Sequence, residues 1–167
     1  MEPKQGITIG LFGTCGGSTW REPFKEEYRR RGILFFDPQV DDWDPSMADI
    51  EAEHLADDEV ILFPVLGETY GSGSLAEVGF SILQAVKLNA RRTIIVYIER
   101  DLDEHLDDPV ARKESQRARA LVLAHLKKMD LDGPILVDNL DDMLQASLLA
   151  YEGAQLRDRL KQFNVLA

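Results

Sequence analysis

The chain has 167 residues, 44% of them hydrophobic and 29% charged, which fits one globular domain over residues 1–167. Its formal net charge of -11 disfavours nucleic acid and anionic membrane surfaces as partners, and no apolar run nears the 18 residues of a membrane span. The single cysteine, Cys15, allows no intrachain disulfide, and the N-terminus has no apolar signal core, so we expect a cytoplasmic protein.

Strands and helices are expected to alternate along the chain. Apolar runs predict the strands, and helical periodicity with end signals such as Gly32 and Asn139 predicts the helices. The expected strands are 7–12, 33–36, 59–65, 93–98 and 134–137, and the expected helices are 21–31, 46–56, 74–88, 110–129 and 139–163, with Ser46 and Ser74 as N-caps.

This alternation predicts an α/β fold, a doubly wound parallel sheet of five strands in the order 2-1-3-4-5 with helices on both faces. The cleft of such a sheet lies beyond the carboxyl ends of the strands, at the switch point between strands 1 and 3. The two most unusual loops of this sequence follow those two strands. The sequence therefore places a candidate site between them.

The first loop, at 13–21, reads Gly-Thr-Cys-Gly-Gly-Ser-Thr-Trp-Arg and leads into a helix. Glycines let a ligand approach the backbone closely, and a helix N-terminus favours negative charge. Ser18, Thr19 and Arg21 add hydrogen-bond donors. We interpret this segment as a binding loop, with an ordinary strand-to-helix turn as the alternative.

The second loop, at 68–77, ends in Ser-Leu-Ala-Glu at the start of a helix. The helix dipole can keep a carboxylate at Glu77 ionised there, and such a carboxylate can attack an anomeric carbon as positive charge develops on it. The alternative is that Ser74 and Glu77 form an ordinary capping box. The local sequence leaves these two interpretations equal.

The acidic helix segment at 49–54 precedes the third strand, so one of its carboxylates could reach the cleft. Glu51 or Glu53 would then shuttle a proton or hold the sugar hydroxyls, and a second carboxylate would move the two pKa values apart. A solvated charged face is the alternative for each residue. The three histidines are scattered, which argues against a metal site.

The segment at 37–43, Asp-Pro-Gln-Val-Asp-Asp-Trp, follows the second strand. Trp43 could stack on a base, and Asp41 or Asp42 could accept hydrogen bonds from the amino groups of a base. A rigid turn with a tryptophan over the sheet edge is the alternative.

Three of these segments, taken together, resemble one known family. Residues 13–21 behind the first strand, 36–43 behind the second and 74–79 behind the third are similar to the motifs of the nucleoside 2-deoxyribosyltransferase-like family. The resemblance covers roughly the first half of the chain. It implies a flavodoxin-like fold, a homodimer or higher homo-oligomer, and cleavage of N-glycosidic bonds in a nucleoside or nucleotide with neither a metal nor an organic cofactor.

The resemblance also implies roles for individual residues. Glu77 would be the nucleophile that forms a glycosyl-enzyme intermediate, and Glu51 would assist it. Gly71 stands where characterised transferases carry a base-binding aspartate, so Tyr70 is one candidate for contacting the base instead, and hydrolysis becomes an alternative to transfer. The residues expected to contact substrate are Gly13, Thr14, Gly16, Ser18, Arg21, Asp37, Asp41, Trp43, Glu53, Tyr70, Gly73 and Ser74.

Two other functions fit parts of the sequence. Cys15 and Arg21 have the spacing of the phosphate-binding loop of protein tyrosine phosphatases, in which a thiolate attacks phosphorus. Against this function, no convincing general-acid loop follows, and the loop at 68–77 would have no role. The other alternative is a non-catalytic nucleotide sensor on the same scaffold, because a fold alone does not determine activity.

Overall fold

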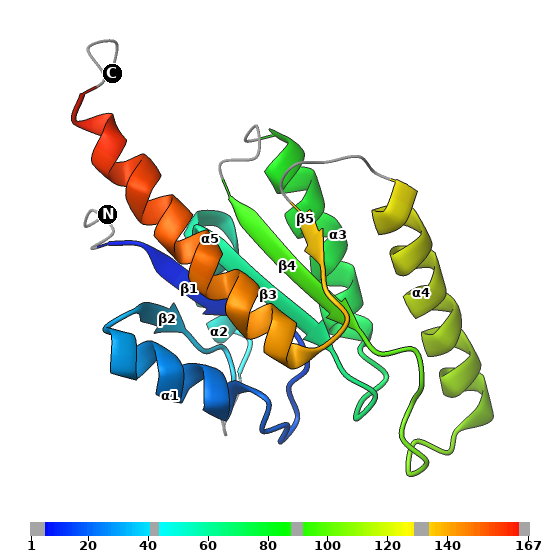
Figure 1. The fold of residues 1–167 in the computed structure, drawn as a ribbon. Helices are drawn as coiled ribbons and strands as arrows, with labels where there is room; N and C mark the ends of the chain where they lie inside the picture. Colours follow the sequence, from blue (N-terminus) through cyan, green and yellow to red (C-terminus); the bar gives the residue numbers. More distant parts are fainter. Residues whose placement is uncertain (1–5, 41–43, 88–91, 129–133, 164–167) are drawn as a thin grey trace.

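A computed structural model describes residues 6–40, 44–87, 92–128 and 134–163 (Figure 1). The strands are Thr8–Leu11 (β1), Leu34–Phe36 (β2), Val60–Val65 (β3), Thr93–Ile98 (β4) and Pro134–Leu136 (β5). They form one parallel sheet in the order β2-β1-β3-β4-β5, which confirms the expected flavodoxin-like topology. Consecutive strands β1 and β2 are neighbours, whereas β3 pairs with the opposite side of β1, so the switch point lies between β1 and β3.

The helices are Arg21–Arg31 (α1), Met47–Asp57 (α2), Ser72–Lys87 (α3), Pro109–Lys128 (α4) and Leu140–Lys161 (α5). Figure 1 shows α1 and α5 on the near face of the sheet, where Phe24 and Leu148 share a core with Leu62. On the other face, Val78 of α3 and Val122 of α4 pack in a core with Phe63. None of the helices in these ranges combines the length and apolar character that crossing a bilayer requires.

Two helix-end signals were predicted correctly because they act through neighbouring residues. Gly32 ends α1 with a left-handed backbone, φ 67°, and its amide donates to the carbonyl of Arg29 at 3.2 Å. Asn139 caps α5, since its side-chain oxygen accepts from the amide of Asp142 at 2.7 Å.

The predicted N-cap at Ser74 is wrong, because α3 begins two residues earlier, at Ser72. Gly71 has a left-handed backbone, φ 69°, and its carbonyl accepts from the amide of Leu75 at 2.9 Å, which closes the first turn. Ser74 therefore lies within that turn. Glu77 lies in the second turn, deeper in the helix than a capping box would place it.

The predicted side-chain cap at Ser46 is also wrong, although α2 does begin directly after this residue. The hydroxyl and the amide of Ser46 both donate to a carboxylate oxygen of Asp44, at 2.5 and 2.7 Å. The hydroxyl thus bonds to a side chain outside the helix, and these bonds also lower the pKa of Asp44.

Candidate functional site

A cleft of about 380 Å³ lies where the sequence placed a candidate site, at the carboxyl ends of β1 and β3. All the segments of interest contribute to it: the loop after β1, the start of the β2–α2 connection, helix α2, and the loop leading into α3. The residues that line it are Phe12, Gly13, Cys15, Gly16, Pro38, Glu51, Thr69, Gly71, Ser72, Gly73, Ser74 and Glu77.

The loop after β1 is packed against the end of β3, and this packing needs Gly13 and Thr14. A Cβ atom on Gly13 would lie 2.5 Å from the carbonyl oxygen of Pro64, and the backbone there has φ 93°. The Thr14 amide donates to the same carbonyl at 2.9 Å, and the Thr14 hydroxyl accepts from the Leu66 amide at 2.8 Å. Thr14 therefore connects the two loops of the site.

Arg21 lies beneath this loop, 1% exposed, and its guanidinium donates to protein acceptors. Nε donates to the carbonyl of Leu11 at 2.8 Å, and Nη1 donates to that of Thr14 at 2.7 Å. Asp37 lies 3.2 Å from Nε and adds an ion pair. Neither Arg21 nor Asp37 is among the residues that line the cleft, so in this arrangement both shape the loop from behind.

The tip of the loop leaves its backbone open. Gly16 and Gly17 have φ of 76° and 88°, and the nearest atom to a Cβ on Gly16 would be Thr69 Cγ2, 4.0 Å away. Ser18, 7% exposed, precedes α1, and its hydroxyl has no hydrogen-bond partner among the described residues. The loop tip therefore offers open backbone rather than bulky side chains, whereas Ser18 is buried and does not line the cleft.

Two carboxyl groups from different helices, Glu51 of α2 and Glu77 of α3, line the same cleft. Burial raises the pKa of Glu77, the negative charge of Glu51 raises it further, and the positive charge of Arg21 opposes both effects. Glu53, the other candidate on α2, is exposed and does not line the cleft. The helix thus presents Glu51 to the cleft, since residues two apart on a helix point in different directions.

Cys15 also lines the cleft, and part of its surface is open to solvent. Desolvation by the surrounding protein raises the pKa of the thiol; Arg21 lowers it, and Glu51 and Glu77 raise it. A phosphatase nucleophile needs the opposite, a thiol with a depressed pKa. Because Arg21 also donates to Cys15 Sγ, at 3.3 Å, and to backbone carbonyls, the geometry does not favour phosphate transfer through this pair.

The loop after β3 contributes the opposite wall. Gly73 and Ser74 line the cleft, whereas Tyr70 does not, and the Tyr70 carbonyl accepts from the hydroxyl of Ser115 in α4 at 2.7 Å. Asp41 and Trp43, the expected base-binding residues, lie outside the described residues. Sequence reasoning missed Pro38 and Thr69 as lining residues, because neither stood out by chemistry.

A larger cleft, about 550 Å³, lies at the carboxyl ends of β4 and β5. Its polar lining comes mainly from the acidic 99–103 segment, with Lys127 and Asp138 nearby. The first cleft is the better candidate because it lies at the switch point and joins the loops that the sequence singled out. Among the described residues, no group of three or more histidine, cysteine or acidic side chains could hold a metal ion.

Comparison of the chain with protein-family models and with curated proteins finds no match.

Proposed function

We propose that the protein cleaves the N-glycosidic bond of a nucleoside or nucleotide, with Glu77 as nucleophile and Glu51 as its acid–base partner. The observation that carries the proposal is that these two carboxyls, from α3 and α2, share one cleft with the glycine-rich loop. The volume of this cleft, about 380 Å³, suits a small molecule. The three-segment resemblance supports a sugar–base bond as the bond that breaks.

The reaction would proceed in two displacements at the anomeric carbon, C1′. The Glu77 carboxylate attacks C1′ while the C1′–N bond breaks, and the base leaves with the bonding electron pair and takes a proton from Glu51. Water or a second base then attacks C1′, gives a proton to Glu51 and releases Glu77. The pair must hold one proton at the start, a state that two neighbouring carboxyls favour.

The rest of the cleft fits the remaining parts of such a substrate. The side chain of Ser74, one turn before Glu77, supplies a hydroxyl for the sugar. The open backbone at Gly16 leaves room for the 5′ end of a nucleoside or its monophosphate, near the N-terminus of α1. Arg21 and Asp37 support this loop from behind.

The direct test is to incubate the protein with nucleosides and their 5′-monophosphates and to follow free base by chromatography. Glu77→Gln should lower turnover of an active substrate by on the order of 10³-fold or more, since it removes the nucleophile. Glu53→Gln, an exposed change on α2, is the matched control and should leave turnover unchanged. Adding a second base separates transfer from hydrolysis.

Cys15 gives a binding assay that does not depend on turnover, because it is the only cysteine and it lines the cleft. A nucleoside bound beside Glu77 should slow alkylation of Cys15. If a nucleoside protects Cys15 from alkylation in both wild type and Glu77→Gln and no base is released, the protein is a nucleotide sensor rather than an enzyme. Release of base that Glu77→Gln does not reduce would refute the assigned nucleophile.

A further inference from the structure

A buried arginine on α4 contacts the loop that leads to Glu77. Arg119 is 1% exposed, although α4 is otherwise a strongly charged helix. Its guanidinium donates five hydrogen bonds, four to backbone carbonyls and one to a neighbouring hydroxyl. The acceptors are Val65 O (2.8 Å), Leu66 O (2.8 Å), Thr69 O (2.8 Å), Glu99 O (2.8 Å) and Ser115 Oγ (3.2 Å).

Three of these carbonyls belong to the end of β3 and the loop that follows it. Ser115, one turn earlier on α4, adds a fourth contact, to the carbonyl of Tyr70 at 2.7 Å. Gly71 then packs against the same guanidinium: a Cβ atom there would lie 3.2 Å from Arg119 Nη2 and 2.7 Å from Val65 Cγ1. The backbone of this loop is therefore held by α4 from residue 65 to residue 71.

This loop determines where α3 begins. The Gly71 carbonyl accepts from the Leu75 amide at 2.9 Å and so closes the first turn of the helix. Thr69 and Ser74 from the same stretch line the cleft, and Glu77 follows in the next turn. A displacement of the loop carbonyls would therefore move the first turns of α3 and the carboxyl that they carry.

We propose that Arg119 is a positioning residue of the candidate site, which acts on Glu77 through the carbonyls of Leu66 and Thr69. Its catalytic consequence rests on the proposed function, whereas its effect on the loop does not. Losing the guanidinium would leave several buried carbonyls without donors, and this opens the loop locally. The positive charge of Arg119 is not what acts on Glu77, because the charges that shift the pKa of Glu77 are those of Glu51 and Arg21.

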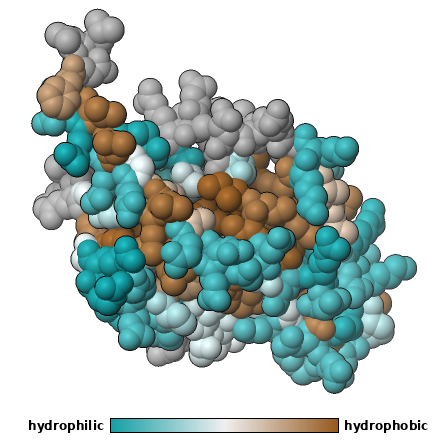
Figure 2. Space-filling model, in the orientation of Figure 1, coloured by the Kyte–Doolittle hydropathy of each residue, from teal (hydrophilic) through white to brown (hydrophobic). Residues whose placement is uncertain are grey.

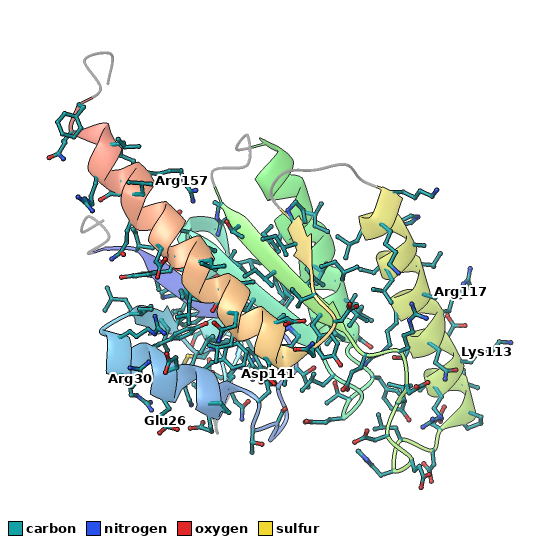
Figure 3. The ribbon with its side chains drawn as sticks, in the orientation of Figure 1. Glu26, Arg30, Lys113, Arg117, Asp141 and Arg157 are labelled. Carbon is teal, nitrogen blue, oxygen red and sulfur yellow. The ribbon has the colours of Figure 1, made fainter. Side chains whose placement is uncertain are left out.

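Arg112 provides a matched control on the same helix. It also donates to backbone carbonyls, at 2.7 Å to Asp103 and 2.6 Å to Leu106, but these belong to the loop between β4 and α4. Arg117, which points away from the sheet on the outer side of α4 (Figure 3), controls for loss of a surface charge. The three variants Arg119→Gln, Arg112→Gln and Arg117→Gln thus remove the same group from three environments.

The test combines hydrogen exchange with steady-state kinetics. In Arg119→Gln, amides of the 66–75 segment should exchange on the order of tenfold faster than in Arg112→Gln or Arg117→Gln. The value of kcat should fall by on the order of 10²-fold, the cost of misplacing a reacting group by about 1 Å. Arg119→Lys should recover part of both, since an ammonium replaces some of the donors.

Unchanged exchange over 66–75 in Arg119→Gln would overturn the inference, and so would equal losses of kcat in Arg119→Gln and Arg112→Gln. If Arg119→Gln does not fold, Ser115→Ala removes the contact to Tyr70 and the acceptor of Arg119 Nε but leaves the four carbonyl contacts of Arg119, so it should give the same local pattern, more weakly. If the wild type releases no base from any substrate, the proposed function fails, while the exchange measurement still decides whether Arg119 holds the loop.

Discussion

Glu77 and Glu51 reach one cleft from two helices, and the negative charge of Glu51 raises the pKa of Glu77. In the proposed mechanism Glu77 attacks only as a carboxylate, and burial is the main cause that raises its pKa. The acidic limb of the pH–rate profile should therefore lie above the ordinary glutamate pKa. In the proposed reactive form the proton of the pair lies on Glu51, so this limb reports Glu77 beside a neutral neighbour.

The variant Glu51→Gln tests this distribution of the proton. Its maximal rate should fall by roughly 10²–10⁴-fold because the acid–base group is lost, while its acidic limb in kcat/KM should stay near the wild-type position, since Glu51 already carries the proton in the reactive form. Profiles measured from pH 4 to 9 provide the comparison, with Glu53→Gln as the control that keeps the wild-type profile. An acidic limb that moves to lower pH in Glu51→Gln would show that Glu51 is charged in the reactive form and does not supply the proton.

The same shift has a consequence for stability. Because the folded state raises the pKa of Glu77, folding binds this proton more tightly, so the associated stability is present at low pH and is lost as pH rises through the folded pKa. Glu77→Gln should therefore raise the melting temperature at pH 7 by a few degrees at most, about 1 kcal/mol corresponding to ~2–4 °C in a chain of this size.

This gain should shrink when melting is measured at pH 4, where the wild-type carboxyl is protonated. A stabilisation in Glu77→Gln that is equal at both pH values would contradict a desolvated carboxyl. Functional sites commonly contain an ionisable group whose burial shifts its pKa and lowers the stability of the fold.

At the scale of elements, every strand and helix was predicted within about two residues of its bounds, because apolar runs, Gly32 and Asn139 are local signals. The start of α3 was misplaced, since it depends on Gly71 packing against Val65 at the end of β3 and against Arg119 of the distant helix α4. The role of Arg119 was not predicted for the same reason, because the carbonyls that it contacts belong to other elements. Nothing in the sequence separates a buried arginine, satisfied by carbonyls, from the exposed arginines beside it.

For the candidate site, the sequence identified the switch point, Glu77, Glu51 and the glycine-rich loop, all of which contribute to the cleft. It could not show that Arg21 donates to Leu11 and Thr14 carbonyls rather than facing a ligand. A guanidinium suits both situations, and only the tertiary packing decides between them.

The close approach of the β1 loop to β3 predicts the effect of a single methyl group. Gly13→Ala would place Cβ 2.5 Å from the Pro64 carbonyl oxygen at φ 93°, so it should destabilise the fold by roughly 2–4 kcal/mol. Gly17 has a similar φ of 88° with no atom within 4 Å of a Cβ, so Gly17→Ala should cost only the backbone strain, about 1–2 kcal/mol. Urea unfolding measures both values, and equal losses in the two variants would mean that the loop does not pack on β3 as described.

At the scale of the whole molecule, the surface is predominantly hydrophilic, but Figure 2 shows apolar side chains exposed on the face that carries α5. Leu149, Leu156 and Leu160 are 68%, 56% and 56% exposed, and their spacing places them along one side of the helix, with Phe163, 74% exposed, just past its end. Exposed apolar rows of this kind mark interaction surfaces. The homo-oligomer that the family resemblance implies would use such a row.

The charges of α5 indicate the partner and its direction. From its start to Glu152 it carries Asp141, Asp142 and Glu152 without a basic residue, whereas after Glu152 it carries Arg157, Arg159 and Lys161 against the single acid Asp158. Asp141 and Arg157 lie toward opposite ends of the helix in Figure 3. Two copies of α5 packed antiparallel around a two-fold axis at Leu156 would place the apolar row against itself and Glu152 of one copy near Lys161 of the other, which is the geometry of a symmetric dimer.

We therefore predict a dimer in solution that Leu156→Glu dissociates, because this change places a charge in the middle of the apolar row. Light scattering after size exclusion at protein concentrations around tens of micromolar should give twice the chain mass for the wild type and the chain mass for the variant, with unchanged far-UV circular dichroism. Val110→Glu, at an apolar side chain 71% exposed on α4, is the control and should stay dimeric. Arg157→Glu should weaken the dimer without abolishing it, since rim charges contribute less than the buried apolar contacts. A monomeric wild type, or a Leu156→Glu variant that remains a dimer, would exclude α5 as the contact between copies.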